Sequence, residues 1–120
     1  MKWDLEYLMN PRSSKAKGRR LQNYLRDLLK EAFPSLRDDD IKSQIMRVSG
    51  EDVVFSPLSK RLIGLSFECK NQERLNLWDS LSQAETNCED RTPVLVFKRN
   101  RSKTYAAIPF EFLIKLLSVN

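Results

Sequence analysis

The strongest constraint on the fold is an alternating run of residues in the middle of the chain, from Leu62 to Lys70. Apolar side chains occupy every second position of this run, and polar ones stand between them. One side takes Ile63, Leu65, Phe67 and Cys69, and the other side takes Ser66, Glu68 and Lys70. A period of two is typical of a β-strand with one face toward a core, so the chain must supply partner strands and a cover for that face.

Apolar residues recur at helical spacing before and after this strand. The predicted helices cover Gly18–Phe33, Arg74–Asn87 and Phe110–Leu117. Further strands are predicted at Met46–Ser49, Asp52–Pro57, Pro93–Lys98 and Thr104–Pro109, with turns at Ser59–Arg61 and Arg99–Lys103. The order α-β-β-β-α-β-β-α predicts an α/β fold in which helices flank a mixed β-sheet.

Large aromatic residues are expected in the core of this fold, because they fall on the apolar positions of their elements. They are Phe67, Trp78, Phe97 and Phe110. The buried stripe of the helix over 74–87 is predicted to be Leu77, Trp78, Leu81 and Ala84.

Composition narrows the chemistry more than it narrows the fold. The chain has 120 residues and no histidine, which excludes Ser-His-Asp and Cys-His catalysis and an imidazole base. Zinc sites lose their commonest nitrogen ligand, and two cysteines cannot supply a four-cysteine set. Catalysis would therefore depend on carboxylates, lysines, hydroxyl groups or a metal held by oxygen.

The length predicts one domain, residues 18–120, preceded by a basic N-terminal arm over residues 1–17. The first ten residues do not resemble an export signal, so Cys69 and Cys88 are expected to be reduced and to act as small hydrophobes. No apolar run approaches the roughly 20 residues that cross a membrane. A cytoplasmic protein is expected.

Two carboxylates and a lysine form the most informative combination in the sequence. Glu68 and Lys70 are two apart on a strand and so share a face. Asp52 lies sixteen positions before Glu68, and a turn at 59–61 would pair the two strands as a hairpin. Converging carboxylates favour Mg²⁺, for which Mn²⁺ can substitute, and the Cys69 carbonyl would be a further oxygen ligand. Lys70 would then orient or deprotonate a water, or neutralise charge.

A simpler interpretation of Glu68 and Lys70 is a solvated strand face, because a lone Glu-x-Lys pair is frequent. The upstream Asp52 and the apolar strands around it favour the catalytic interpretation. The run Asp38–Asp40 is interpreted as an acidic start of a short helical turn, because consecutive side chains fan outward.

Asp52 with Glu68-x-Lys70 resembles the core of the PD-(D/E)XK nucleases, and the surrounding residues resemble the Holliday-junction-resolvase-like members of archaea and phages. The likeness extends over residues 15–118. It is carried by Lys17-Gly18-Arg19-Arg20, by Arg47-Val48-Ser49-Gly50, by Trp78 and Gln83, by Pro93–Lys98, and by Pro109–Leu113. This resemblance implies a restriction-endonuclease-like fold, a catalytic set of Asp52, Glu68 and Lys70, and a homodimer in which each subunit cuts one strand.

The sequence departs from the family pattern at two positions. An acidic residue that the family often has in its first helix is Gln22 here, which can support a metal-bound water but adds no charge. Glu51 stands where the family name has proline and is a rival metal ligand to Asp52. Adjacent strand residues face opposite ways, so both reach Glu68 only if the strand bulges; the motif favours Asp52.

Basic residues gather in two segments. The chain has 21 Lys and Arg residues against 16 acids, a net charge of +5. The residues expected to contact DNA are Lys15, Lys17, Arg19 and Arg20 near the first helix, Lys98, Arg99, Arg101 and Lys103 on the late turn, and Arg47 and Ser49. Such contacts position a phosphate backbone without reading sequence. The alternative is a solvated tail and a charged hairpin tip.

The sequence thus predicts a Mg²⁺-dependent endonuclease that hydrolyses phosphodiester bonds in branched DNA, with no small-molecule substrate and no membrane partner. Two alternatives stay open. One is a nicking or site-specific nuclease of phage or mobile-element type on the same core. The other is a non-catalytic DNA-binding module that has kept the fold.

Overall fold

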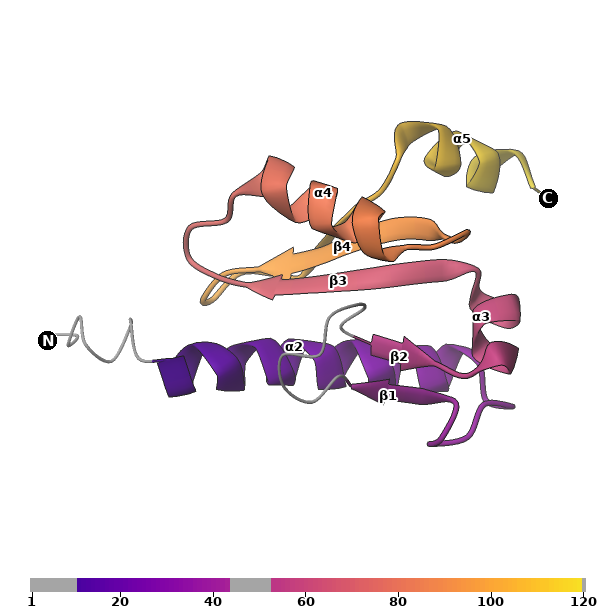
Figure 1. The fold of residues 1–120 in the computed structure, drawn as a ribbon, viewed down its shortest axis with the longest axis horizontal. Coiled ribbons are helices and arrows are strands. Elements are labelled where there is room, and N and C mark those ends of the chain that lie inside the picture. The colour runs from indigo at the N-terminus through magenta and orange to yellow at the C-terminus, as the bar shows by residue number, and fades with distance from the viewer. Residues whose placement is uncertain (1–10, 44–52, 120) are drawn as a thin grey trace, which may run out of the picture.

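Four helices and five strands make up residues 11–43 and 53–119, the part of the chain that the computed structural model describes (Figure 1). In chain order they are α2 (Pro11–Ala32), β1 (Ile41–Ser43), β2 (Val53–Phe55), α3 (Pro57–Ile63), β3 (Leu65–Asn71), α4 (Leu77–Asn87), β4 (Thr92–Lys98), β5 (Tyr105–Ala107) and α5 (Phe110–Ser118). The predicted α/β class is confirmed.

A three-stranded sheet in the order β3-β4-β5 lies in the middle layer. β3 and β4 run parallel, with Glu68 opposite Leu95, whereas β5 returns antiparallel to β4. The mixed sheet that the sequence predicts is therefore present. β4 is its central strand, and Val94, Leu95 and Val96 are buried there, as expected for an apolar run covered on both faces.

Helices cover both faces of this sheet (Figure 1). α2 and the short β1–β2 ladder lie on one side, and α4 lies on the other. The main core forms on the α2 side, where Leu21 and Leu25 of α2 pack with Phe67 and Cys69 of β3. The rings of Phe55 and Phe67 meet edge to face at 6.0 Å between centroids, so β2 also packs against this face of β3.

Three predictions about elements are wrong. α2 begins at Pro11, seven residues before the predicted start of that helix at Gly18, so residues 11–17 of the predicted arm are helical. The predicted turn at Ser59–Arg61 lies inside α3, a helix capped by the Ser56 side chain and ended by Gly64. Among the described strands β2 pairs with β1 and not with β3, so the predicted hairpin is not formed. The predicted strand over 46–49 lies outside the described residues.

Two aromatic side chains are not in the core, contrary to prediction. Trp78 is 77% exposed, because the buried face of α4 is set by Ser80 and Ala84. Phe110 is 68% exposed at the start of α5, a helix with no buried residue. Phe67 is buried as predicted and Phe97 is half-buried. The remaining predicted elements, α4, β4, β5 and α5, lie within a few residues of their predicted bounds.

Candidate active site

Glu68 and Lys70 lie together on one face of β3, as the strand period predicts. The Lys70 Nζ stands 3.6 Å from the Glu68 Oε2. The Glu68 side chain is 8% exposed and that of Lys70 is 21% exposed. A carboxylate this buried is stable when a cation compensates it, and the lysine provides that compensation while it stays accessible to a solvent-borne anion.

The neighbours of this pair come from β4 and from α4. In the parallel register Glu68 lies opposite Leu95 and Lys70 opposite Phe97, so the carboxylate has an apolar strand at its side. Ser66, on the same face of β3, is buried under α4 together with Ser80. The pair is thus presented by a regular strand in a packed layer of the fold.

Two other predicted members of the site, Gln22 and Cys69, have side chains on the other side of β3 from Glu68 and Lys70 or on the helix that covers that side. Gln22 is half-buried on α2, and α2 packs on the face of β3 that carries Phe67 and Cys69. Gln22 therefore stands on the helix that covers the opposite face from Glu68. The buried side chain of Cys69 turns into the core, so only its carbonyl could serve as the predicted ligand.

Asp52, Arg47 and Ser49 lie outside the described residues, and so does the rival Glu51. The convergence of Asp52 and Glu68 therefore stays a prediction. Within residues 11–43 and 53–119, no three residues of the metal-ligating types His, Cys, Asp and Glu gather as a group.

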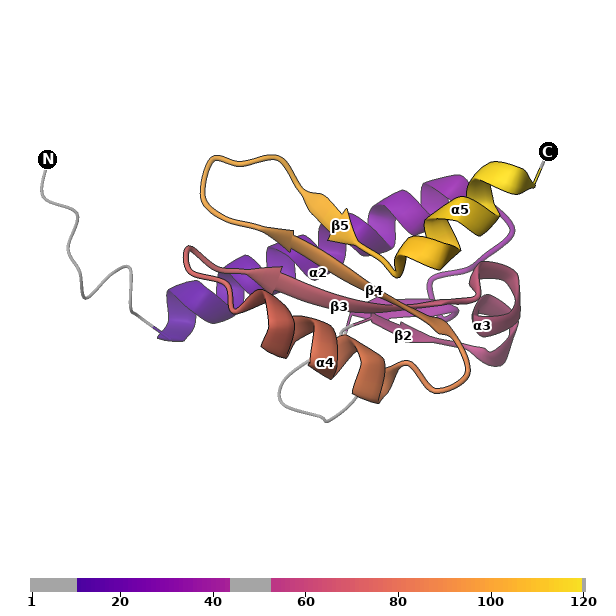
Figure 2. The same ribbon diagram turned by 90° about the horizontal axis from the view of Figure 1, so that it is seen from above.

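The carboxyl end of β3 meets both basic segments at one end of the molecule (Figures 1 and 2). Asn71, directly after Lys70, donates a hydrogen bond from Nδ2 to the Lys17 carbonyl of α2 at 3.1 Å. The turn after β4 is joined to the segment after β3 by two further bonds. These are Gln72 N to Lys98 O at 3.1 Å and Asn100 N to Glu73 Oε2 at 2.7 Å.

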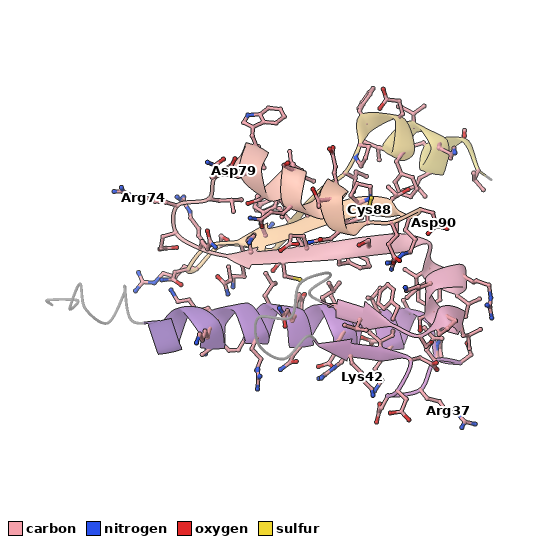
Figure 3. The ribbon with its side chains drawn as sticks, viewed as in Figure 1. Arg37, Lys42, Arg74, Asp79, Cys88 and Asp90 are labelled. Carbon is pink, nitrogen blue, oxygen red and sulfur yellow. The ribbon has the colours of Figure 1, made fainter. Side chains whose placement is uncertain are left out.

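The cations at this end are mostly accessible. Lys15, Arg19, Arg20, Arg99, Arg101 and Lys103 are exposed, and Lys17 and Lys98 are half-buried. The late turn is itself ordered by hydrogen bonds, because the Ser102 hydroxyl accepts from Arg99 N at 3.0 Å. Arg74 extends outward from the loop between β3 and α4 at the same end (Figure 3), a cation that the sequence interpretation did not include.

A second group of cations includes three residues, Arg26, Lys30 and Lys42, that the sequence interpretation missed, together with the predicted Arg19. Arg19, Arg26 and Lys30 of α2 and Lys42 of β1 line a hollow between these two elements. The signal on α2 was available, because positions 19, 23, 26 and 30 recur at helical spacing. The approach of β1 to that stripe is a tertiary contact and has no local signal.

The aspartates of the acidic run over 38–40 make different contacts. The Asp40 carboxylate accepts from Arg37 N–H at 2.8 Å and from the Ser56 hydroxyl at 2.7 Å. The Arg37 bond first and the Ser56 bond second hold the pKa of Asp40 below its ordinary value. Asp38 instead pairs with Lys30 at the hollow.

Comparisons of this chain with protein-family models, with curated proteins and with solved structures give no match. Within the described ranges, no helix has the length and apolar character needed to span a bilayer. The family assignment therefore stays a prediction from the sequence.

Proposed function

We propose that the protein is a Mg²⁺-dependent DNA endonuclease with a PD-(D/E)XK site, selective for branched DNA. The observation that carries the proposal is the Glu68–Lys70 pair, 3.6 Å apart on one face of β3. It stands next to the point where α2 and the late basic turn meet the end of that strand. A carboxylate, a lysine and flanking cations are the groups that phosphodiester hydrolysis needs when a chain has no histidine.

The donor set fits a hard cation. Glu68 supplies a carboxylate oxygen, and we assign Asp52 as the second carboxylate and the Cys69 carbonyl as a further oxygen. Bound Mg²⁺ would supply an acidified water and charge stabilisation at the phosphate. Lys70, as an ammonium ion beside Glu68, would orient that water and neutralise charge developing at the phosphate. To accept the water's proton it would first have to release one of its own. The flanking cations would hold the backbone on both sides of the scissile bond.

The restriction-endonuclease-like arrangement belongs to the same proposal. So does a homodimer acting in the cytoplasm of a prokaryotic or phage-infected cell. α5 supports self-association, because Ile114, Leu116 and Leu117 are exposed on a helix with no buried residue. Exposed apolar surface of this kind marks interaction sites.

Cleavage by two variants tests the site. Glu68→Ala and Lys70→Ala are each expected to lower Mg²⁺-dependent cleavage by about 10²–10⁴-fold, while DNA binding in EDTA changes little. Glu85→Ala and Arg61→Ala are matched controls on exposed positions of α4 and α3. Glu68→Gln serves as a second variant if the alanine destabilises the fold. Unchanged cutting by a folded Glu68 or Lys70 variant would remove the assignment.

The choice of DNA separates the alternatives. Purified protein is incubated with Mg²⁺ or EDTA and a four-way junction, a flap, a single strand or a linear duplex of matched sequence. Preferential cutting of the junction is expected. Cutting of linear duplex at one sequence would indicate the nicking or site-specific alternative. Tight, salt-sensitive binding without cleavage or metal binding would indicate the non-catalytic module.

A further inference from the structure

The hollow between α2 and β1 is strongly cationic. It has a volume of about 550 Å³, and Arg19, Arg26, Lys30 and Lys42 line it. The only carboxylate among its lining residues in the described part of the chain is Asp38. Figure 3 shows Lys42 on the outer side of β1, below α2 and away from the sheet. A concave surface with this charge concentrates anions.

The α2 cations form a straight track. Arg19, Arg26 and Lys30 are seven and four positions apart, so they lie on one face of the helix. The first and the last are eleven positions apart, which is about 17 Å along the helix axis. That length corresponds to about five base pairs of rise along one DNA strand. Lys42 of β1 widens the track from a second element.

Acidic neighbours occupy these cations only loosely. Asp27 Oδ1 accepts from Arg26 Nη2 at 3.0 Å, Asp38 pairs with Lys30, and Asp39 Oδ1 lies 3.7 Å from Lys42 Nζ. These three aspartate side chains are 65%, 87% and 95% exposed, in that order. Exposed ion pairs add little net stability, so an incoming phosphate can replace the aspartates. Asp38 competes most directly, because it lines the hollow itself.

We propose that this hollow binds the phosphodiester backbone of DNA, as a second contact outside the Glu68–Lys70 centre. The choice of DNA as the occupant rests on the proposed function. Arg19 lines the hollow and lies two residues after Lys17, whose carbonyl accepts from Asn71 at the carboxyl end of β3. One backbone that runs along α2 would therefore reach the end of β3. No aromatic side chain lines the hollow among the described residues, which favours backbone contacts over base stacking.

Neutralising the cations tests the hollow. Arg26→Gln and Lys42→Gln are each expected to weaken binding of a fluorescein-labelled 30-base-pair duplex several-fold, measured by anisotropy in EDTA. Each is also expected to lower the slope of log K against log salt by about 1. Arg61→Gln, an exposed cation on α3, is the matched control. Affinity and slope that both variants leave at the control value would overturn the proposal.

Removal of the carboxylate that competes with DNA is expected to raise the affinity for duplex DNA, whereas removal of a cation lowers it. Asp38→Asn is expected to tighten duplex binding several-fold, because Lys30 loses its internal partner. A gain of affinity cannot come from partial unfolding, so this variant guards the test against loss of structure. Unchanged or weaker binding by Asp38→Asn would contradict a phosphate site at Lys30.

A polyglutamate peptide of matched charge separates DNA from an acidic protein partner. If it bound as tightly as the duplex and with the same dependence on Arg26 and Lys42, the DNA proposal would be overturned. Cleavage with Mg²⁺ is measured in a separate assay, so that failure of the proposed nuclease activity can be told from failure of the proposed binding site. If the wild-type protein binds DNA through the hollow but does not cut it with Mg²⁺, the proposed nuclease activity is wrong and the proposed binding site stands. If the protein cuts DNA and substitutions in the hollow change neither binding nor cutting, the nuclease activity stands and the binding site is wrong.

Discussion

At the scale of single residues, Asp40 ties the turn before β1 to the start of α3. Its carboxylate accepts from the Ser56 hydroxyl, and its carbonyl accepts from the Ser59 hydroxyl at 2.8 Å. Ser59 is fully buried, and the Ser56 side chain also accepts from Ser59 N as the helix cap. Polar groups buried in this way stabilise a fold only while they remain paired, so this small network is sensitive to single substitutions.

Ser56→Ala is expected to lower the free energy of unfolding by about 1 kcal/mol at pH 7, the usual effect of a lost N-cap. It also removes one of the bonds that lower the pKa of Asp40. A lowered folded pKa adds stability above the unfolded value of about 3.9 and loses it as pH falls through the folded value. The difference from wild type should therefore shrink between pH 7 and pH 3 in urea unfolding.

The control for this prediction is Ser82→Ala on an exposed position of α4. It is expected to change stability little at either pH. Equal effects of the Ser56 and Ser82 substitutions at pH 7 would show that the network around Asp40 does not contribute to folding.

At the scale of elements, α3 depends on its two ends. It has seven residues, too few for a marked apolar stripe, but Ser56 caps its start, Pro57 is its first residue and Gly64 ends it. Gly64 has φ +68°, a left-handed conformation in which glycine is favoured. Gly64→Ala is expected to lower the free energy of unfolding by about 1 kcal/mol and Gly64→Asn by less, measured by urea denaturation.

No atom lies within 4 Å of a Cβ added at Gly64, so this cost would come from the backbone alone. Gly18→Ala is the matched control, because that glycine also has open space around it and lies inside α2. Helix propensity predicts a gain there. A loss at Gly18 as large as that at Gly64 would contradict the explanation.

Local patterns were sufficient for most elements and for part of the site. The period of two predicted β3 and placed Glu68 beside Lys70, because side-chain direction on a strand follows from backbone geometry. α3 was missed since its signal lies in the caps and not in periodicity. The pairing of β2 with β1 was missed because strand pairing depends on tertiary packing. For the same reason the sequence did not predict that Lys42 would line one hollow together with Arg26.

At the scale of the whole molecule, charge and apolar surface separate. The basic segments gather at the end where α2 begins and β3 ends (Figures 1 and 2). The hollow is lined by residues of α2 and β1, and these two elements lie on the far side of the sheet from α4 (Figure 1). α5 lies away from α2, beyond the layer that α4 forms on the sheet (Figure 1). A molecule arranged in this way can bind DNA on one side while a second copy covers the other.

In the proposed homodimer, we expect α5 to form the contact between the two subunits. Leu117 is 66% exposed on α5, so Leu117→Glu should change the stability of a monomer by no more than about 0.5 kcal/mol. If a second copy covers α5, the same change places a charge in an apolar contact and should convert a dimer to a monomer in sedimentation velocity. Leu28→Glu, at an exposed apolar position of α2, should leave the dimer intact. A monomeric wild type, or a dimer that persists with Leu117→Glu, would contradict α5 as the subunit contact.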